Sequence, residues 1–134
     1  MNNFKKIMIA ICCIGVLSAV GYLYSYISDL NNYKSTVAGL KIAEIDLSKV
    51  SDGTYRGGCD ANFVAAEVSV TVKDHKITDI QLIKHKTERG QIAEVIPAKV
   101  ISAQSLHVDT ISGATNSSKV ILKAIETAVN SGKQ

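Results

Sequence analysis

The sequence predicts an α+β protein with one N-terminal transmembrane helix and a small antiparallel-sheet domain that also contains helices. Three patterns support this fold: an uncharged apolar run over residues 7–28, alternating valines over residues 67–73, and a helical apolar stripe over residues 120–129. The strand patterns precede the helical ones and do not alternate with them, which favours α+β over α/β. The 134 residues correspond to one domain once the apolar run is set aside.

The apolar run is long enough to span a membrane. Its roughly 22 residues, at about 1.5 Å each in a helix, extend about 33 Å and cross a bilayer core. Lys5 and Lys6 precede the run and the next basic residue is Lys34, so the positive-inside rule predicts a cytoplasmic amino terminus. We expect residues 1–28 to be a single-pass anchor in the cell membrane, with the following domain on the extracytoplasmic side. Interfacial tyrosines are expected near its outer end: Tyr22, Tyr24 and Tyr26.

Two other interpretations of this run remain open. A cleaved signal peptide also has a basic start, an apolar core and small residues such as Ser18 and Ala19. The run continues to Ile27 without a clear small-x-small cleavage site, which favours a retained anchor. A lipoprotein is less favoured, because Cys12 and Cys13 lie deep within the run and neither follows a small residue.

The charge balance argues against nucleic acid as a partner. The formal net charge is +3, but from Asp29 onward 13 basic residues face 12 acidic ones. The part of the chain beyond the membrane therefore has no basic excess, which a nucleic-acid-binding surface requires.

A polar segment and a hairpin follow the anchor. Residues 29–50 are polar with scattered apolar positions and are expected to be a spacer, so that the folded domain covers residues 51–134. A turn at Asp52-Gly53 precedes a short strand at residues 54–56. Valines then alternate with polar residues up to Lys73, a tight turn follows at residues 74–76, and residues 77–84 return as an antiparallel partner.

The apolar period then changes from two to that of a helix. Residues 91–104 are expected to be helical, with Pro97 either starting a second short helix or kinking a single one. After a loop at residues 105–116, an apolar stripe predicts the strongest helix of the chain. Ser117 or Ser118 is expected to cap its start, and Gly132 lies just past its end.

The usual catalytic and metal-binding patterns are missing from the sequence. His75, His85 and His107 are far apart and lack ligand-spaced partners, so we expect no metal site. There is no nucleophile elbow, phosphate loop or dinucleotide-binding fingerprint, and we assign no catalytic residue. Cys59 is the one thiol beyond the anchor and is expected to be a half-buried strand residue rather than a redox group.

One loop remains as a candidate binding site. Residues 109–118, DTISGATNSS, contain small hydroxyl residues and run into a helix amino terminus. Gly113 and Ala114 allow a ligand close to the backbone, and first-turn amides favour an anion such as phosphate. An ordinary capped helix uses the same residue types, so the pattern alone leaves both interpretations open. The candidate binding residues are Asp109, Ser112, Gly113, Ala114, Thr115, Asn116, Ser117 and Ser118.

The same loop resembles a known motif. Residues 109–115, DTISGAT, are similar to the D-x-x-[ST]-G-A-T flavinylation motif of FMN-binding domains. These domains occur in flavin-carrying subunits of the sodium-pumping NADH:quinone oxidoreductase, in the related ferredoxin-linked complex and in small extracytoplasmic flavoproteins. The resemblance extends to DGTY at residues 52–55, to the hairpin at residues 68–83 and to AQSLHVD at residues 103–109. The glycine-rich stretch after DGTY is thinner here, and His75 stands where glycine is common.

The resemblance implies a cofactor and a means of attaching it. Thr115 would carry FMN through a phosphodiester, made by a magnesium-dependent flavin transferase that uses FAD. The protein would then be a membrane-anchored extracytoplasmic electron carrier rather than an enzyme with its own substrate site. Its electron donor would be a membrane protein such as a quinone oxidoreductase, because the anchor limits how far the domain can move. A covalent cofactor outside the cell is also not lost by dilution.

Two other functions are weighed against this one. A non-covalent FMN-binding or sensor module would release its flavin on denaturation. A pilin-like structural protein shares the apolar amino-terminal helix and the small α+β domain. That class uses a glutamate near the start of the apolar helix, and residues 7–28 contain none.

Overall fold

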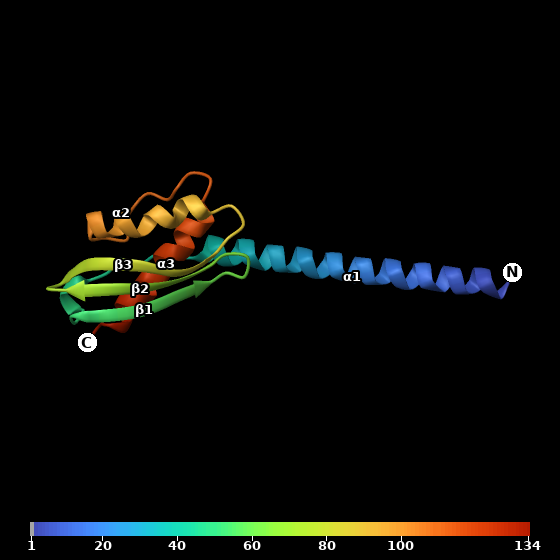
Figure 1. Ribbon diagram of the computed structural model, residues 1–134, viewed down its shortest axis with the longest axis horizontal. Coiled ribbons are helices and arrows are strands. Elements are labelled where there is room, and N and C mark those ends of the chain that lie inside the picture. The colour runs from blue at the N-terminus through green and yellow to red at the C-terminus, as the bar shows by residue number, and fades with distance from the viewer. Residues whose placement is uncertain (1) are drawn as a thin grey trace. The chain divides into compact units, whose positions relative to one another are not determined.

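The computed structural model describes residues 2–134, which fall into two compact units, Met1–Lys34 and Ser35–Gln134. In the first unit, residues 3–34 belong to α1, Asn3–Gly39. The second contains the last residues of α1, a three-stranded sheet and two further α-helices, as Figure 1 shows. This composition confirms the α+β prediction.

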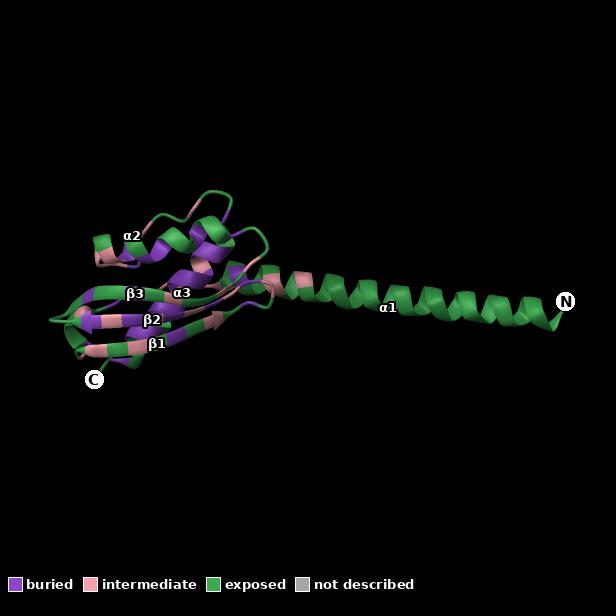
Figure 2. Cartoon of the chain, viewed as in Figure 1, coloured by how far each residue is buried: buried purple, intermediate pink, exposed green. Residues whose placement is uncertain are grey.

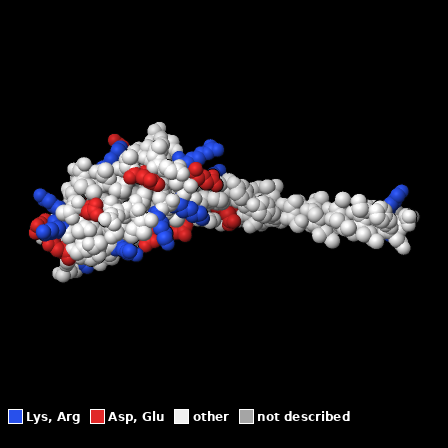
Figure 3. Space-filling view, in the orientation of Figure 1, with Lys and Arg blue, Asp and Glu red and all other residues white. Residues whose placement is uncertain are grey.

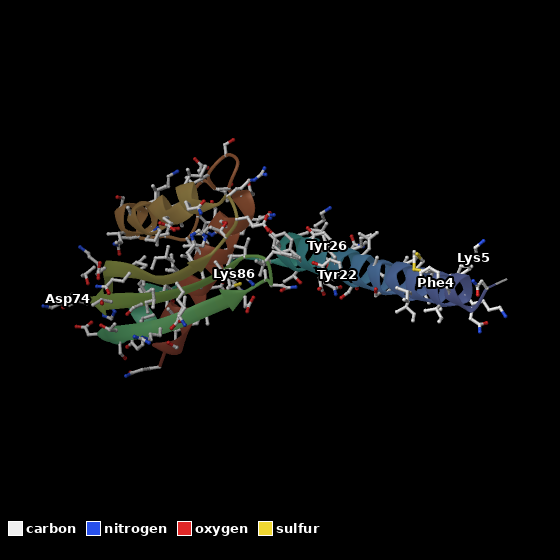
Figure 4. All side chains as sticks on the ribbon, turned by 45° about the vertical axis from the view of Figure 1, so that its right-hand side comes forward. Phe4, Lys5, Tyr22, Tyr26, Asp74 and Lys86 are labelled. Atoms are coloured by element: carbon white, nitrogen blue, oxygen red, sulfur yellow. The ribbon has the colours of Figure 1, made fainter. Side chains whose placement is uncertain are left out.

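Within the described residues, α1 is the one helix long and apolar enough to cross a membrane. The apolar side chains of residues 4–27 are exposed, and in Figure 3 this part of the helix is free of charge beyond the lysines near the amino terminus. Tyr22 and Tyr26 project outward from this helix (Figure 4). These features fit a candidate membrane anchor.

The predicted spacer, residues 29–50, has more structure than the sequence suggested. Its first part continues α1 as far as Gly39, and a short 3-10 helix, η1, covers Leu47–Lys49. The folded unit begins at Ser35, and three apolar side chains within residues 35–50 are buried: Val37, Ile45 and Val50. The buried carboxylate of Glu126 accepts a hydrogen bond from the Ala43 amide at 3.0 Å. Residues 40–50 therefore pack onto the domain and contribute Ile45 and Val50 to its core.

The sheet has the order β1-β2-β3 and is antiparallel throughout. β1 is Gly53–Asp60, longer than the strand predicted at residues 54–56, and β2 and β3 are Ala65–Lys73 and Lys76–Lys86. The predicted hairpin is confirmed. Asp74 and His75 both have positive φ, 50° and 58°, which is typical of the two-residue turn that joins twisted strands.

One face of the sheet is covered by α3, Thr115–Ser131 (Figure 1). The alternating valines of β2 face this helix and are buried, as is the apolar stripe of α3 (Figure 2). Gly57 of β1 lies directly against the α3 backbone at Ala124 and Ala128, where a side chain would collide. The helix therefore sits as close to the sheet as two backbones allow.

The segment after β3 forms two short helices. η2, Gln91–Val95, is followed by α2, Ile96–Ala103, with Pro97 in the first turn of α2. This confirms the alternative in which Pro97 starts a second short helix, a position where its missing amide costs nothing. The buried side of α2 consists of Ile96, Pro97 and Val100.

Gln104 fixes where α2 ends. It adopts the left-handed conformation with φ 52° and caps the helix. Its side-chain amide accepts a hydrogen bond from the Ile77 amide at 2.8 Å and donates to the Ile77 carbonyl at 2.8 Å. Gln104 thus satisfies the backbone at the free edge of β3 as a further strand would. The chain turns back here, and this turn sets the path of the loop that follows.

Candidate functional site

The predicted motif forms a tight turn followed by a helix. The Ala114 amide donates to the Ile111 carbonyl at 2.9 Å, which closes a four-residue turn. Gly113 has φ 81° at the third position, a conformation that glycine adopts without steric cost. No atom lies within 4 Å of the position where a Cβ would stand on Gly113. The backbone of the turn is therefore accessible from this side.

Helix α3 begins at Thr115, whereas the predicted loop extended to Asn116. The N-cap is Ala114, and no side chain caps the helix, so the prediction that Ser117 or Ser118 does so is wrong. The first intrahelical bond runs from the Ser118 amide to the Ala114 carbonyl at 2.9 Å. Amides that precede this bond have no acceptor within the helix, and the positive end of the helix dipole lies here.

Ser118 holds the turn onto the helix from inside. Its side chain is fully buried, and its hydroxyl donates to the Ala114 carbonyl at 2.8 Å. The same oxygen accepts a hydrogen bond from the Ile111 amide at 3.0 Å. Both ends of the Ile111–Ala114 turn are thereby fixed by one serine. These two hydrogen bonds account for the buried serine at position 118, so no ligand is needed to explain it.

Ser117 is also buried and faces a segment that the sequence analysis did not select. Its hydroxyl lies 3.1 Å from the hydroxyl of Thr87, which also accepts from the Gly90 amide at 2.8 Å. Gly90 lies so close to Ser117 that any side chain there would overlap it. Residues 87–90 therefore form the wall beside the start of α3. The Thr-x-x-Gly spacing is too common to have been selected from one sequence.

His85 ties the end of β3 to η2 near this wall. Its imidazole is almost fully buried, and Nδ1 lies 3.0 Å from Oε1 of Glu94. Within residues 2–134, Nε2 of His85 has no hydrogen-bonding partner. Because β3 and η2 are joined by residues 87–90, this pair helps to hold that loop in place.

The structure therefore divides the predicted site residues into two groups. An exposed group can contact a ligand at the helix start: Asp109, Ser112, Gly113, Thr115 and Asn116. Ala114, Ser117 and Ser118 are buried, and the two serine hydroxyls bond within the protein. Thr115 is the first helical residue and is exposed, so its hydroxyl is accessible to a reacting group.

Cys59 lies away from this loop, on β1. Its thiol is half-buried, and the burial raises its pKa, while nearby Lys123 lowers the pKa and Asp60 raises it. A raised pKa keeps the sulfur as an unreactive thiol at neutral pH. This confirms Cys59 as a half-buried strand residue.

Replacing Ser118 with alanine is expected to lower the free energy of unfolding by about 1–3 kcal/mol, because the part-buried Ile111 amide loses its acceptor. Urea unfolding of the purified chain in detergent, followed by circular dichroism, measures the change. The matched control is Ser112→Ala in the exposed part of the same turn, which is expected to leave the unfolding midpoint close to wild type. Equal effects of the two substitutions would contradict the assigned role of Ser118.

Comparison with known proteins identifies the domain that contains this site. The family model described as FMN-binding domain matches residues 65–130. NADH:acrylate oxidoreductase of Vibrio harveyi is 38% identical over 66 residues, which are 47% of this chain and 7% of that protein. An uncharacterized protein of Treponema pallidum (strain Nichols) is 26% identical over 82 residues, 59% of this chain and 23% of that protein. The chain thus matches only a minor part of each relative, and its match to the FMN-binding domain family covers residues 65–130.

Proposed function

We propose that this protein is a membrane-anchored electron carrier, with FMN bound covalently through a phosphodiester to Thr115. The FMN-binding domain and the apolar helix α1 fit a membrane-anchored FMN-binding protein. In this proposal residues 51–134 lie on the extracytoplasmic side of the membrane.

The observation that carries the proposal is the position of Thr115. It is the exposed first residue of α3, directly after the Gly113 turn and inside the matched FMN-binding segment. A hydroxyl buried among side chains, as in Ser117 or Ser118, is closed to a transferring enzyme. Among these three neighbouring hydroxyl residues, Thr115 is the one that is exposed.

The surroundings of Thr115 suit a phosphate. A phosphodiester retains one negative charge, and the positive end of the helix dipole favours an anion at this place. The open space at Gly113 leaves room for phosphate oxygens beside the backbone. Ser112 is exposed in the same turn, and a serine hydroxyl can donate a hydrogen bond to a phosphate oxygen. The donor set therefore fits the FMN phosphate.

The attachment step needs a separate enzyme and FAD. The Thr115 oxygen forms a bond to the phosphorus on the flavin side of FAD, the pyrophosphate bond breaks, and AMP leaves. The threonine proton passes to the transferase or to solvent. We propose that a magnesium-dependent flavin transferase recognises Asp109, Ser112, Gly113 and Ala114 around the acceptor.

The carrier role follows from the chemistry of the cofactor and from the anchor. FMN supplies reversible electron uptake and release, and the protein sets its exposure and electrostatic environment. The similar protein from Vibrio harveyi is named an oxidoreductase. We propose that this domain receives electrons from a membrane protein such as a quinone oxidoreductase and has no substrate site of its own.

The test uses the full chain produced with and without a flavin transferase. The protein is denatured, digested and analysed by mass spectrometry, and an FMN-sized increment is expected on the peptide that holds Thr115. Thr115→Ala is expected to lose the increment completely. Thr110→Ala, which changes an exposed threonine in the same loop, is the matched control and is expected to keep it.

The outcomes separate the covalent and non-covalent possibilities. Yellow protein that loses its flavin on denaturation would favour a non-covalent FMN module. An increment that survives in Thr115→Ala would contradict Thr115 as the attachment residue.

A further inference from the structure

A groove of about 630 Å³ lies along α2, beside the loop that leads to Thr115. One wall is the exposed side of α2, and the other is the stretch from His107 to Asp109. Asp109 is the first residue of the DTISGAT motif, so the groove is continuous with the candidate site. Its lining consists of Val95, Ala98, Lys99, Ser102, Ala103, His107, Val108 and Asp109.

We propose that this groove binds the isoalloxazine ring of the FMN attached at Thr115, with Lys99 stabilising the reduced ring. The inference rests on the proposed function. The volume falls within the roughly 300–1,000 Å³ typical of cofactor and ligand pockets. Val95 is 49% exposed, and several other lining side chains are apolar. A flat aromatic ring placed here would cover them and remove apolar surface from water.

The path of the chain brings Thr115 to one end of the groove. After Gln104 the loop turns back beside α2, and α3 begins at its far end, next to η2 (Figure 1). The contact between Ser117 and Thr87 fixes this arrangement, because Thr87 and Gly90 lead directly into η2. Val95 is the last residue of η2 and the first residue of the groove lining. The ring of a cofactor tethered at Thr115 can therefore enter the groove from the Val95 end.

Lys99 gives the groove a function beyond binding. On two-electron reduction, oxidised FMN takes up two electrons and one proton, and the reduced ring carries one negative charge. Within residues 2–134, the Lys99 ammonium has no hydrogen-bonding or ion-pair partner, so its charge remains available. A positive charge beside the ring favours the reduced form and raises the midpoint potential.

A second groove, of about 650 Å³, is less suited to the ring. It lies over the β1, β2 and β3 residues near Lys86, whose position Figure 4 shows, and it includes none of the motif residues. Its three cations already have partners: Glu67 lies 3.8 Å from Arg56 and 3.9 Å from Lys84, and the Lys86 ammonium donates to the Asn62 carbonyl at 2.6 Å. Of these two grooves, the α2 groove is the one that is continuous with the motif and is lined by a cation with no partner among residues 2–134.

The experiment uses the full-length flavinylated protein in detergent and two groove variants. Lys99→Met is expected to shift the midpoint potential to more negative values. Ala98→Leu fills the groove and is expected to increase the quenching of flavin fluorescence by iodide, because the ring becomes exposed. Lys76→Met, at the exposed turn between β2 and β3, is the control and is expected to change neither quantity.

The mass increment on the Thr115 peptide is measured for every protein. A retained increment with unchanged potential in Lys99→Met and unchanged quenching in Ala98→Leu would overturn the groove assignment. An increment missing from wild type would instead contradict the proposed function. The two failures are therefore distinguishable.

Discussion

Replacing Gly57 with alanine is expected to lower the free energy of unfolding by about 3 kcal/mol or more, at the upper end of overpacking effects. The added methyl group would collide with the backbone of α3 at Ala124 and Ala128. Backbone cannot rotate away as a side chain can, so the whole helix must move off the sheet. Since α3 carries much of the buried core, this displacement also opens the contacts made by Val120, Ile121, Ile125 and Val129.

Gly58→Ala is the matched control for this prediction. It changes the next residue of the same strand, where the nearest atom to an added Cβ is the Ala66 carbonyl oxygen at 3.5 Å, an ordinary contact. Urea unfolding of both variants and wild type, followed by circular dichroism, gives the comparison. Similar unfolding midpoints for Gly57→Ala and Gly58→Ala would show that α3 does not depend on close approach at Gly57.

Gly90→Ala is expected to have the largest effect on the site itself, with a strong loss of covalent FMN. The new methyl carbon would overlap the Ser117 side chain and would lie 2.5 Å from the Thr87 hydroxyl oxygen. Gly90 has φ −97°, which alanine adopts without strain, so the effect comes from space alone. The first turn of α3, including Thr115, must then shift away from residues 87–90. The fraction of flavinylated protein, measured by mass spectrometry after co-expression with the transferase, reports this shift.

A second substitution tests the cause of the Gly90 effect. Ser117→Gly removes the side chain that the new methyl group would meet, so the double variant is expected to recover flavinylation relative to Gly90→Ala. Its cost is the lower helix propensity of glycine, about 1 kcal/mol. Failure of the double variant to recover, with Ser117→Gly alone fully flavinylated, would mean that contact with Ser117 is not the reason. Normal flavinylation of Gly90→Ala would contradict the whole argument.

The two glycines show a limit of sequence analysis. The sequence indicated Gly113 because glycine allows a ligand close to the backbone, and in the structure Gly113 lies in a turn with φ 81°. Gly57 and Gly90 carry no local signal, since both are required by segments distant in the chain: α3 for one and Ser117 for the other. A close contact between two segments that are far apart in the chain does not appear as a periodic pattern in the sequence of either segment.

The sequence also did not indicate which polar side chains form hydrogen bonds inside the protein. The hydroxyl-rich run at residues 109–118 was visible, but the sequence did not indicate which hydroxyls face outward. In the structure the Ser117 and Ser118 hydroxyls bond inside the protein, whereas Thr115 is exposed. Gln104 similarly serves as an edge partner for Ile77, a role that depends on where α2 ends beside β3.

The sequence by itself determined the elements whose signal is periodic and local. These are the apolar span in α1, the valine alternation of β2, the hairpin turn at Asp74 and His75, and the apolar stripe of α3. Each follows from one segment, because side-chain direction repeats every two residues in a strand and about every 3.6 in a helix.

Only the tertiary structure decided the full length of β1, the packing of residues 40–50 and the wall that residues 87–90 form beside Thr115. It also decided the register of β3, where irregularities in its pairing with β2 beside Val68 and Val72 interrupt simple alternation. These features depend on contacts between segments far apart in the chain. Their energies come from close packing and from satisfying buried polar groups, which no single segment encodes.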